Sequence, residues 1–261
     1  MTAVDFAAFV DDLADLSGQT ILPFFRSALV AENKATVGDF DPVTEADRAA
    51  EAAMRKRIRE TFPAHGIEGE EYGTENTDAE FVWVLDPIDG TKAFISGLPL
   101  WGTLIGLKHN DTPAYGLMHQ PFIGERFFGD GGETRYRGRG GERVLTTRRC
   151  ASLAEATIAT TSPRMFAAHE IEAYRRVESA TRLARYGCDC YAYCMLAAGH
   201  IDIVIEAGLK PCDIVALAPI IEGAGGIVTT WDGGPVTQGG AIVAAGDPRM
   251  HEAALALLAQ G

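Results

Sequence analysis

Two carboxylates stand three residues apart in the segment Asp86-Pro-Ile-Asp-Gly-Thr91, directly after a short apolar run. The proline between them limits the backbone, so Asp86 and Asp89 can converge on one point. Hard cations such as Mg²⁺ take oxygen ligands of this kind, and backbone amides at Gly90 and Thr91 suit a phosphate oxygen. Because the D-x-x-D spacing is common, an Asx turn with solvated carboxylates explains this segment, taken alone, about equally well.

Further acidic residues occur upstream and downstream of this segment. Glu70 and Glu71 precede the apolar run, and Thr44-Glu-Ala-Asp47 resembles a capping box, with Asp in place of Glu, at the start of a predicted helix. Asp213 stands before a strongly apolar helix, where an ionised side chain is also reasonable as an N-cap. Carboxylates from several segments could therefore meet at one cation site, although each of them alone has a structural explanation.

The charge of the chain argues against some partners. Its 261 residues include 36 acidic and 23 basic side chains, and the formal net charge of −13 repels nucleic acid and anionic membranes at long range. No apolar stretch approaches the roughly 20 residues that span a bilayer. Aspartates near the N-terminus argue against a secretory signal, so the cytoplasm is the expected compartment. We expect neither a nucleic-acid nor a membrane partner.

Cysteine chemistry is a weaker hypothesis. Four of the five cysteines are close in sequence: Cys188, Cys190, Cys194 and Cys212. Their spacing lacks the paired C-x2-C knuckles of structural zinc sites, so buried apolar packing explains them better than a zinc or redox module. No cysteine is followed six residues later by arginine, and D-x-D is absent around Asp86. Neither a cysteine-dependent phosphatase nor an aspartyl-phosphate enzyme is supported.

The elements that would position these residues follow two patterns. The first half predicts amphipathic helices and an antiparallel meander of short strands, with helices at 6–16 and 44–61 and strands at 81–85 and within 102–137. The second half alternates strands and helices, at 157–161, 167–182, 190–199, 201–206, 214–223, 227–230, 241–245 and from 247 onward, as is typical of an α/β arrangement. The change near 148–152 predicts an α+β lobe of residues 1–149 and an α/β lobe of residues 150–261.

Together these pieces resemble the inositol monophosphatase-like, Mg²⁺-dependent, lithium-sensitive phosphatase superfamily. The matching segments are Glu70-Glu71, Asp86–Thr91, Asp213 and Gly223-Ala-Gly-Gly226, in the same order over nearly the whole chain. The histidinol-phosphate phosphatase branch is the most similar, through residues 42–47, 90–101 and 210–213. The inositol-type pattern usually has Trp before the last metal-binding Asp, where this chain has Cys212. The resemblance implies a layered αβαβα sandwich of the inositol monophosphatase/fructose-1,6-bisphosphatase type, with the metal site between the lobes.

The resemblance also implies a set of metal ligands. Two or three Mg²⁺ ions per site would be held by Glu70, Asp86, the backbone carbonyl of Ile88, Asp89 and Asp213. A pair of ions about 3.5–4 Å apart can clamp the attacking and leaving oxygens of an in-line displacement. Such ions also reverse the local field, so the net negative charge of the chain does not exclude a phosphate substrate.

Catalytic roles are implied in the same way. Glu70 and Thr91 would orient the attacking water and accept its proton, and Asp47 would polarise the Thr91 hydroxyl. The amides of Gly90 and Thr91 would bind the phosphate. Lys34 matches a loop lysine of the family, in a loop of about residues 33–43 that we expect to close over the site.

The substrate pocket is implied to involve the segment Gly187-Cys-Asp-Cys190 and Glu206. Asp189 occupies a position where inositol-type members usually have a small residue. Histidinol phosphate has an ammonium group, so the hypothesis is that Asp189 and Glu206 bind the substrate amine by charge-assisted hydrogen bonds. Asp189 as a cap of the helix beginning near residue 190 is an equal alternative, and Arg185 is a weaker pocket candidate.

The expected function is Mg²⁺-dependent hydrolysis of L-histidinol phosphate to L-histidinol and phosphate, a step of histidine biosynthesis. One alternative within the same class is an inositol-1-phosphate or broad sugar-phosphate phosphatase. Another, of a different class, is a catalytically silent metal-binding regulatory protein. The resemblance further implies a homodimer.

Overall fold

The protein is described here by a computed structural model that covers residues 5–27, 32–33 and 42–260. Two helices of the first half, α1 (Phe6–Ile21) and α2 (Glu45–Thr61), agree with the predicted amphipathic helices. The predicted capping box is present at the start of α2, where the Asp47 carboxylate accepts the Thr44 amide at 2.9 Å. The cap depends only on residues close in sequence, which is why the pattern could predict it.

The larger sheet has eight strands in the order β10-β9-β8-β7-β6-β5-β3-β4. Their bounds are β3 (Gly66–Gly69), β4 (Gly73–Glu75), β5 (Phe81–Asp89), β6 (Gly102–His109), β7 (Thr112–Gln120), β8 (Glu125–Gly129), β9 (Thr134–Gly138) and β10 (Gly141–Val144). The run from β5 to β10 is the expected antiparallel meander, extended by β10. β3 pairs with β5 in parallel, and the sequence pattern did not predict β3, β4 or β10.

The smaller sheet has five strands in the order β12-β11-β13-β15-β14. Their bounds are β11 (Thr157–Thr160), β12 (Leu183–Tyr186), β13 (Ile203–Leu209), β14 (Ile227–Thr230) and β15 (Gly240–Ala245). β11 pairs in parallel with both β12 and β13, whereas β15 is antiparallel to β13 and β14. The sheet is therefore mixed, and β12 was not among the predicted strands.

Helices of the second half alternate with these strands, as predicted. They are α4 (Ala168–Ala180), α5 (Asp189–Ala197), α6 (Pro211–Ile214), α7 (Leu217–Gly223) and α8 (Pro248–Leu258). The predicted helix at 214–223 is in fact two helices, and the first begins at Pro211, so Asp213 lies inside α6 rather than before it. Short elements complete the described chain: β1 (Glu32–Asn33), β2 (Pro42–Val43), α3 (Thr91–Ile95), η1 (Leu22–Phe24), η2 (Leu153–Glu155) and η3 (Pro163–Met165).

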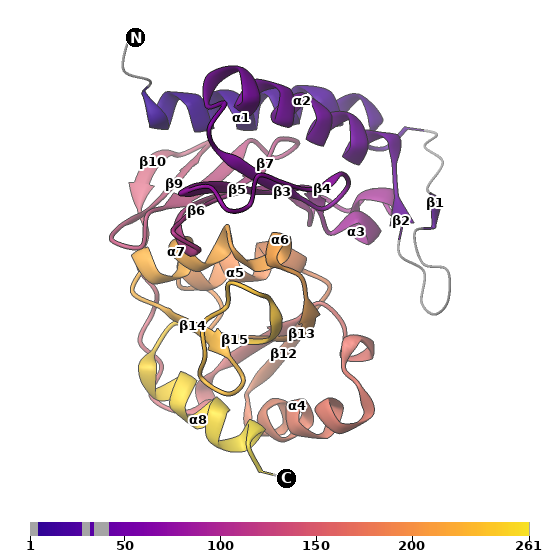
Figure 1. The fold of residues 1–261 in the computed structure, drawn as a ribbon. Coiled ribbons are helices and arrows are strands. Elements are labelled where there is room, and N and C mark those ends of the chain that lie inside the picture. The colour runs from indigo at the N-terminus through magenta and orange to yellow at the C-terminus, as the bar shows by residue number, and fades with distance from the viewer. Residues whose placement is uncertain (1–4, 28–31, 34–41, 261) are drawn as a thin grey trace.

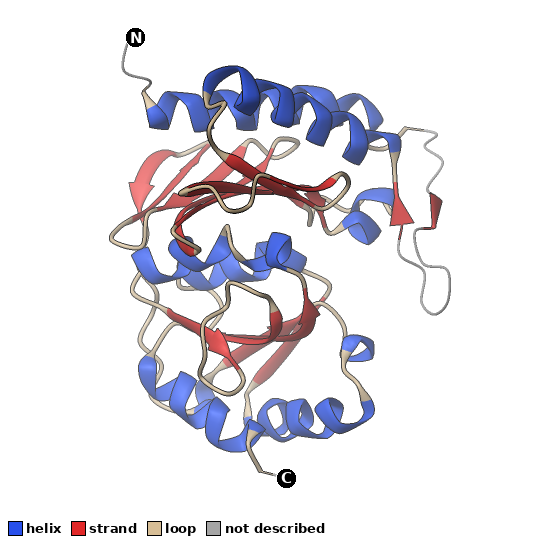
Figure 2. Cartoon of the chain, in the orientation of Figure 1, coloured by secondary structure: helices blue, strands red, loops and turns tan. Residues whose placement is uncertain are grey.

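The elements form five layers. Figure 1 shows α1 and α2 on the outer face of the eight-stranded sheet, then α5, α6 and α7, then the five-stranded sheet, and α4 with α8 on the opposite outer face. The alternation of helical and sheet layers is also visible in Figure 2. The expected layered αβαβα sandwich is confirmed. The division into lobes at 149/150 stays a prediction. The last strand of the larger sheet ends at Val144, and the first strand of the smaller sheet begins at Thr157.

A row of glycines lets the middle helices approach the larger sheet. Gly106, Gly116 and Gly129 are register partners on β6, β7 and β8. A Cβ atom on Gly116 would lie 1.7 Å from the carbonyl oxygen of Ala216, so no larger residue fits without movement of one layer. This contact brings α6 and α7 close to the sheet that contains Asp86. No helix of the described chain is long and apolar enough to cross a membrane.

Candidate active site

Glu70 directly follows β3, and Asp86 lies on β5, the parallel neighbour of β3. Gly69, the last residue of β3, is the register partner of Leu85 on β5, and the Glu70 amide donates to the Leu85 carbonyl at 3.1 Å. The next residue along β5 is Asp86, which is 2% exposed. Because parallel strands end at the same edge of a sheet, the pairing places both carboxylates at one edge.

The end of β5 is irregular, and this irregularity turns Asp89 and the following amides toward the same place. The pairing with β6 shifts register between Asp86 and Asp89. The Ile88 amide donates to Asp86 Oδ1 at 3.0 Å, and the Thr91 hydroxyl donates to the Ile88 carbonyl at 3.0 Å. Gly90 caps α3 with φ of 84°, a conformation that glycine adopts without steric cost. Such strand irregularities commonly redirect side chains at functional sites.

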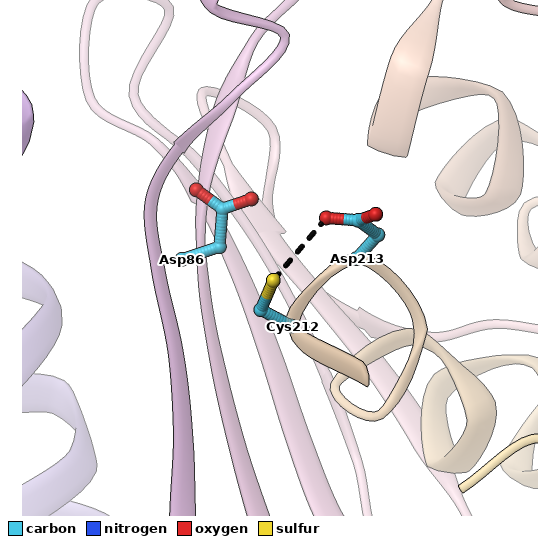
Figure 3. A group of neighbouring side chains, drawn as sticks. All are labelled: Asp86, Cys212 and Asp213. Atoms are coloured by element: carbon cyan, nitrogen blue, oxygen red, sulfur yellow. Dashed lines mark hydrogen bonds between the residues drawn. The ribbon is translucent and has the colours of Figure 1, made fainter. Parts of the chain in front are cut away.

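Asp213 reaches the same point from the middle helical layer. Its carboxylate accepts the Lys210 amide at 2.7 Å and the Cys212 thiol at 3.4 Å. Ligand atoms of Asp86, Cys212 and Asp213 all lie within 4.8 Å of one another. Figure 3 shows the two carboxylates facing each other across the thiol, from β5 and α6. The N-cap explanation of Asp213 is wrong, since the N-cap of α6 is Lys210; Asp213 is the third residue of the helix, and its carboxylate both accepts the Lys210 amide and faces Asp86.

The carboxylates raise one another's pKa. Burial raises the pKa of Asp86 well above its usual value, and the charges of Glu70, Asp89 and Asp213 raise it further. Burial likewise raises the pKa of Asp89, followed by the charges of Asp189 and Asp213. Several carboxylates in one buried place favour the uptake of a cation.

The donor atoms of this site are mostly oxygens. Glu70, Asp86, Asp89 and Asp213 offer carboxylate oxygens, and Ile88 adds a backbone carbonyl; hard cations prefer such oxygen ligands. Burial raises the pKa of the Cys212 thiol strongly, so the sulfur stays protonated and acts as a donor to Asp213 rather than as a soft ligand. The residues present therefore fit Mg²⁺.

A cavity of about 280 Å³ brings most of the predicted residues together. Its wall includes the residues expected to bind metal and phosphate, namely Glu70, Asp86, Ile88, Asp89, Gly90, Thr91 and Asp213. It also includes two expected substrate residues, Asp189 and Glu206. A second cavity of about 610 Å³ adjoins it and shares Lys92, Thr161, Met165 and Asp189.

Two predicted catalytic residues are placed differently or not described. The Thr91 hydroxyl donates to Ile88, and the Asp47 carboxylate accepts the Thr44 amide and hydroxyl. The Thr91 hydroxyl gives its one proton to the Ile88 carbonyl, so Asp47 does not polarise it in this structure; Asp47 Oδ2 accepts from Thr44. Its other oxygen, Oδ1, is buried and has no partner within the described ranges, and burial raises the pKa of Asp47 to about 6. Lys34 lies outside the described residues.

The four expected substrate residues differ in where they lie relative to the two cavities. Asp189 lines both cavities, and burial raises its pKa to about 6 although the nearby Lys92 charge opposes this. Glu206 is 2% exposed, and its two oxygens accept hydrogen bonds from Thr161 and from the Tyr193 hydroxyl. Gly187 lines only the larger cavity.

Arg185 is exposed on β12 and is not in the wall of either of these two cavities.

Helix α5 is capped by Asp89, the last residue of β5 in the larger sheet. The Cys190 amide near its N-terminus donates to Asp89 Oδ2 at 2.6 Å. Asp189 is the first residue of α5 and has φ of 43°, so the predicted alternative role as a cap is taken by Asp89 instead. This contact joins residues 101 positions apart, which is why no local pattern could predict it.

Sequence reasoning missed several residues of the site. Lys92 lines both cavities, and Lys210 Nζ lies 3.3 Å from Glu70 Oε1. Both lysines stand inside the segments 90–101 and 210–213, so a signal for them was present in the sequence. Thr161 and Tyr193 had no such signal, because their role depends on contact with Glu206.

The cysteines do not form a cluster of metal ligands of their own. Cys150, Cys190, Cys194 and Cys212 are buried, and all five cysteines are free. Within the described ranges, the group of His, Cys, Asp or Glu atoms close enough to hold a metal ion is the one containing Cys212 with Asp86 and Asp213.

The fold and the acidic site define the class of protein. The sequence profile of the Inositol monophosphatase family matches residues 4–261, and the chain belongs to this family. Its members are Mg²⁺-dependent phosphatases that act on small phosphate monoesters. The enzyme class expected from the sequence, a phosphoric monoester hydrolase, is thereby supported.

Three known proteins illustrate the relationship. The chain is 45% identical to "Bifunctional phosphatase IMPL2, chloroplastic" of Arabidopsis thaliana, over 96% of this chain and 74% of that protein. It is 32% identical to the "Histidinol-phosphatase" of Mycobacterium tuberculosis, over 87% of this chain and 88% of that protein. A solved structure of an inositol monophosphatase from Zymomonas mobilis has a TM-score of 0.86 and 41% identity, with 96% of each chain covered.

Proposed function

We propose that this chain is a Mg²⁺-dependent phosphomonoesterase that hydrolyses L-histidinol phosphate to L-histidinol and phosphate. The observation that carries the choice of substrate is Asp189, a carboxylate in the wall shared by the two adjoining cavities. A substrate amine placed in this region would gain a charge-assisted hydrogen bond, whereas a neutral polyol would not need the extra negative charge.

The proposed metal ligands are Glu70, Asp86, Asp89, Asp213 and the carbonyl of Ile88. Bound Mg²⁺ would neutralise part of the phosphate charge and lower the pKa of a bound water. Without cations, the carboxylates that raise the pKa of Asp86 would repel a phosphate dianion. Metal binding and substrate binding should therefore depend on each other.

The residues of the chain itself would orient the reactants. Glu70 and Thr91 would hold the attacking water and Glu70 would accept its proton, while the amides of Gly90 and Thr91 would bind phosphate oxygens. Lys92, which follows them and lines the cavity, adds a positive charge beside that position. The phosphoryl group passes to water, and the leaving alkoxide takes a proton to become the hydroxyl of histidinol.

Recognition of the amine would rest on Asp189 more than on Glu206. Both Glu206 oxygens already accept hydrogen bonds, from the Thr161 amide at 2.8 Å and the Tyr193 hydroxyl at 3.1 Å. Glu206 would then support the pocket by fixing Thr161, which lines both cavities. Asp189 receives no backbone amide within the described chain and has a side-chain hydrogen bond with Thr161 alone, so its carboxylate would have more acceptor positions for a ligand than that of Glu206.

The names of the relatives support the proposal and also its main alternative. A histidinol-phosphatase is 32% identical and a bifunctional phosphatase is 45% identical to this chain. An inositol-1-phosphate or sugar-phosphate phosphatase is favoured by the 41% identity to the inositol monophosphatase structure. A catalytically silent regulatory role is less consistent with a cavity whose wall contains the metal carboxylates and Thr91 together. A homodimer and a cytoplasmic location stay predictions; the relative with 45% identity is named as chloroplastic.

The test is phosphate release from purified protein with and without Mg²⁺, using L-histidinol phosphate, myo-inositol 1-phosphate, fructose 1,6-bisphosphate and 3′-phosphoadenosine 5′-phosphate. We expect kcat/KM for histidinol phosphate to exceed the others by at least about 100-fold, which corresponds to about 2.7 kcal/mol of transition-state discrimination. Comparable activity on inositol phosphate would contradict the proposed substrate and leave the proposed metal chemistry unchanged. No Mg²⁺-dependent release from any of the four would support the silent regulatory protein.

A further inference from the structure

The loop that contains Glu70 is held by a buried ion pair of the neighbouring helix. Glu51 and Arg55 lie one turn apart on α2, and their side chains are 0% and 4% exposed. Arg55 Nε donates to Glu51 Oε1 at 2.7 Å. Two charges this deeply buried need further hydrogen bonds to compensate for the loss of water. Figure 1 shows α2 on the outer face of the sheet that contains β3 and β4.

The compensating bonds come from the backbone of the β3–β4 loop. The Glu71 amide donates to Glu51 Oε2 at 2.7 Å, and the Tyr72 amide donates to Oε1 at 3.2 Å. On the other side, the Arg55 guanidinium donates to the Gly73 carbonyl. The ion pair thus holds three consecutive residues of the loop through their main chain, where the identity of their side chains does not matter.

A tight contact at the end of β3 supports the same arrangement. A Cβ atom on Gly69 would lie 2.0 Å from Glu51 Oε1 and 2.7 Å from Arg55 Nη2. The ion pair therefore lies directly against the backbone just before Glu70 as well as just after it. Together with the 3.1 Å hydrogen bond from the Glu70 amide to the Leu85 carbonyl, these contacts hold the main chain on both sides of Glu70.

We propose that Glu51, supported by Arg55, is a positioning residue for Glu70 and thereby sets the affinity of the site for Mg²⁺. The inference rests on the assignment of Glu70 as a metal ligand in the proposed function. A ligand whose backbone is already in place binds with a smaller loss of conformational entropy. Groups that orient metal ligands from behind typically contribute 10- to 100-fold in metal affinity.

The first experiment compares Glu51→Gln with the parent by titration calorimetry of the full chain with MgCl₂, without substrate. Glutamine keeps the size of the side chain but turns an NH₂ donor toward a backbone N–H or the guanidinium. We expect the dissociation constant for Mg²⁺ to rise about 10-fold or more. The matched control is Glu60→Gln, an exposed glutamate near the end of the same helix, which should stay within about 2-fold of the parent.

A double-mutant cycle distinguishes positioning from a general structural effect. If Glu51 acts through Glu70, then Glu51→Gln should weaken Mg²⁺ binding in the parent and change it by less than about 2-fold in the Glu70→Gln background. An equal loss in both backgrounds would overturn the proposal. The proposal would also be overturned if the Glu51→Gln variant bound Mg²⁺ as tightly as the parent while being folded, as shown by cooperative thermal unfolding without metal.

Two further arms keep the result interpretable. If Glu51→Gln does not fold, Arg55→Lys replaces it: lysine keeps the charge but loses the forked contact with Glu51 and Gly73, and we expect about a 3-fold loss of affinity that again requires Glu70. If Glu70→Gln itself binds Mg²⁺ like the parent, the ligand assignment of the proposed function is wrong, and the positioning role of Glu51 is overturned with it. If only the Glu51 and Arg55 variants are without effect, the ligand assignment stands and the positioning role alone is wrong.

Discussion

Two groups of carboxylates in the cavity wall, the proposed metal end and Asp189, are held in different ways. At the metal end, Asp86, Asp89 and Asp213 each accept a backbone amide, from Ile88, Cys190 and Lys210 respectively. Asp189 lines the same cavity, near enough for its charge to add to the effect of burial on the pKa of Asp89, but it stands at the start of α5 in a left-handed backbone conformation and receives no such amide within the described chain. Main-chain amides therefore fix the three carboxylates of the proposed metal end, whereas Asp189 has a side-chain hydrogen bond with Thr161 and is the proposed partner of the substrate amine.

This difference suggests a division of labour. A carboxylate that is fixed by main-chain amides presents one geometry to every substrate, which suits a cation and a phosphate common to all of them. A carboxylate on the wall of the adjoining cavity meets the part of the substrate that varies. Changes at the metal end should affect all substrates alike, and changes at Asp189 should separate them.

The largest effect is expected for Asp86→Asn. Loss of a carboxylate from the metal end should lower kcat/KM by at least about 1,000-fold, about 4 kcal/mol, for histidinol phosphate and inositol 1-phosphate equally. The metal-free variant should unfold at the same or a higher temperature, because like charges raise the pKa of Asp86 and their repulsion is reduced. Phosphate-release kinetics and thermal unfolding measure the two quantities; a loss confined to one substrate would contradict the division.

The contact between the layers should matter for stability and not for selectivity. Gly116→Ala adds a Cβ where the Ala216 carbonyl lies 1.7 Å away, so the free energy of unfolding should fall by about 3 kcal/mol. The control is Gly140→Ala, where a Cβ would meet no atom within 4 Å. Urea unfolding gives the stability. The ratio of kcat/KM values for the two substrates should stay unchanged, and a shift in that ratio would show that the layers also tune the pocket.

A selective effect is expected at Asp189. Asp189→Asn should lower kcat/KM for histidinol phosphate by about 30-fold, about 2 kcal/mol, because a charge-assisted hydrogen bond becomes a neutral one. Activity on inositol 1-phosphate should change by less than about 3-fold. An unchanged KM for histidinol phosphate would remove Asp189 from amine recognition, and equal losses on both substrates would assign it to the metal end.

A smaller effect concerns the larger sheet away from the cavity. Burial lowers the pKa of His119 on β7 to about 4, and the nearby Arg126 charge adds to this. Between that pKa and about 6.5 the unfolded chain binds more protons, so stability is lost as the pH falls through this window. From pH 7.5 to 5.0 this group should cost about 2 kcal/mol.

Urea unfolding at the two pH values checks the role of His119. His119→Gln should lose less stability than the parent on acidification, whereas the exposed His109→Gln should behave like the parent. Substrate selectivity should be the same in both variants. If His119→Gln shows the full parental loss, the acid sensitivity of the fold arises elsewhere.

Features that depend on neighbours in sequence were predictable. The capping box of Thr44 and Asp47 was expected from four residues, and the antiparallel meander from its alternating pattern. The strands β3, β4 and β12 have four residues or fewer and were missed, because such short segments have too little periodicity to be distinguished from loops. One of these, β3, is the strand that places Glu70 beside Asp86.

Features that depend on distant contacts were not predictable. Asp47 was expected to polarise the Thr91 hydroxyl, but in the folded chain this hydroxyl donates to the Ile88 carbonyl instead. Glu51 had no signal of its own in the sequence, since a glutamate on a helix is usually solvated; only the fold turns it inward against the loop that follows Glu70. The local sequence shows which polar side chains are present, and burial in the fold determines which of them need a hydrogen-bond partner.

The sequence by itself determined the chemistry that is available: several carboxylates, a Gly-Thr turn and their order along the chain, which together indicate a metal-dependent phosphatase of this family. The tertiary structure decided where these groups meet and what supports them. It did so because β3 lies parallel to β5, a row of glycines brings α6 against the same sheet, and Asp89 caps α5 in the middle helical layer. Each of these contacts joins residues far apart in the chain, and their positions follow from packing the layers together.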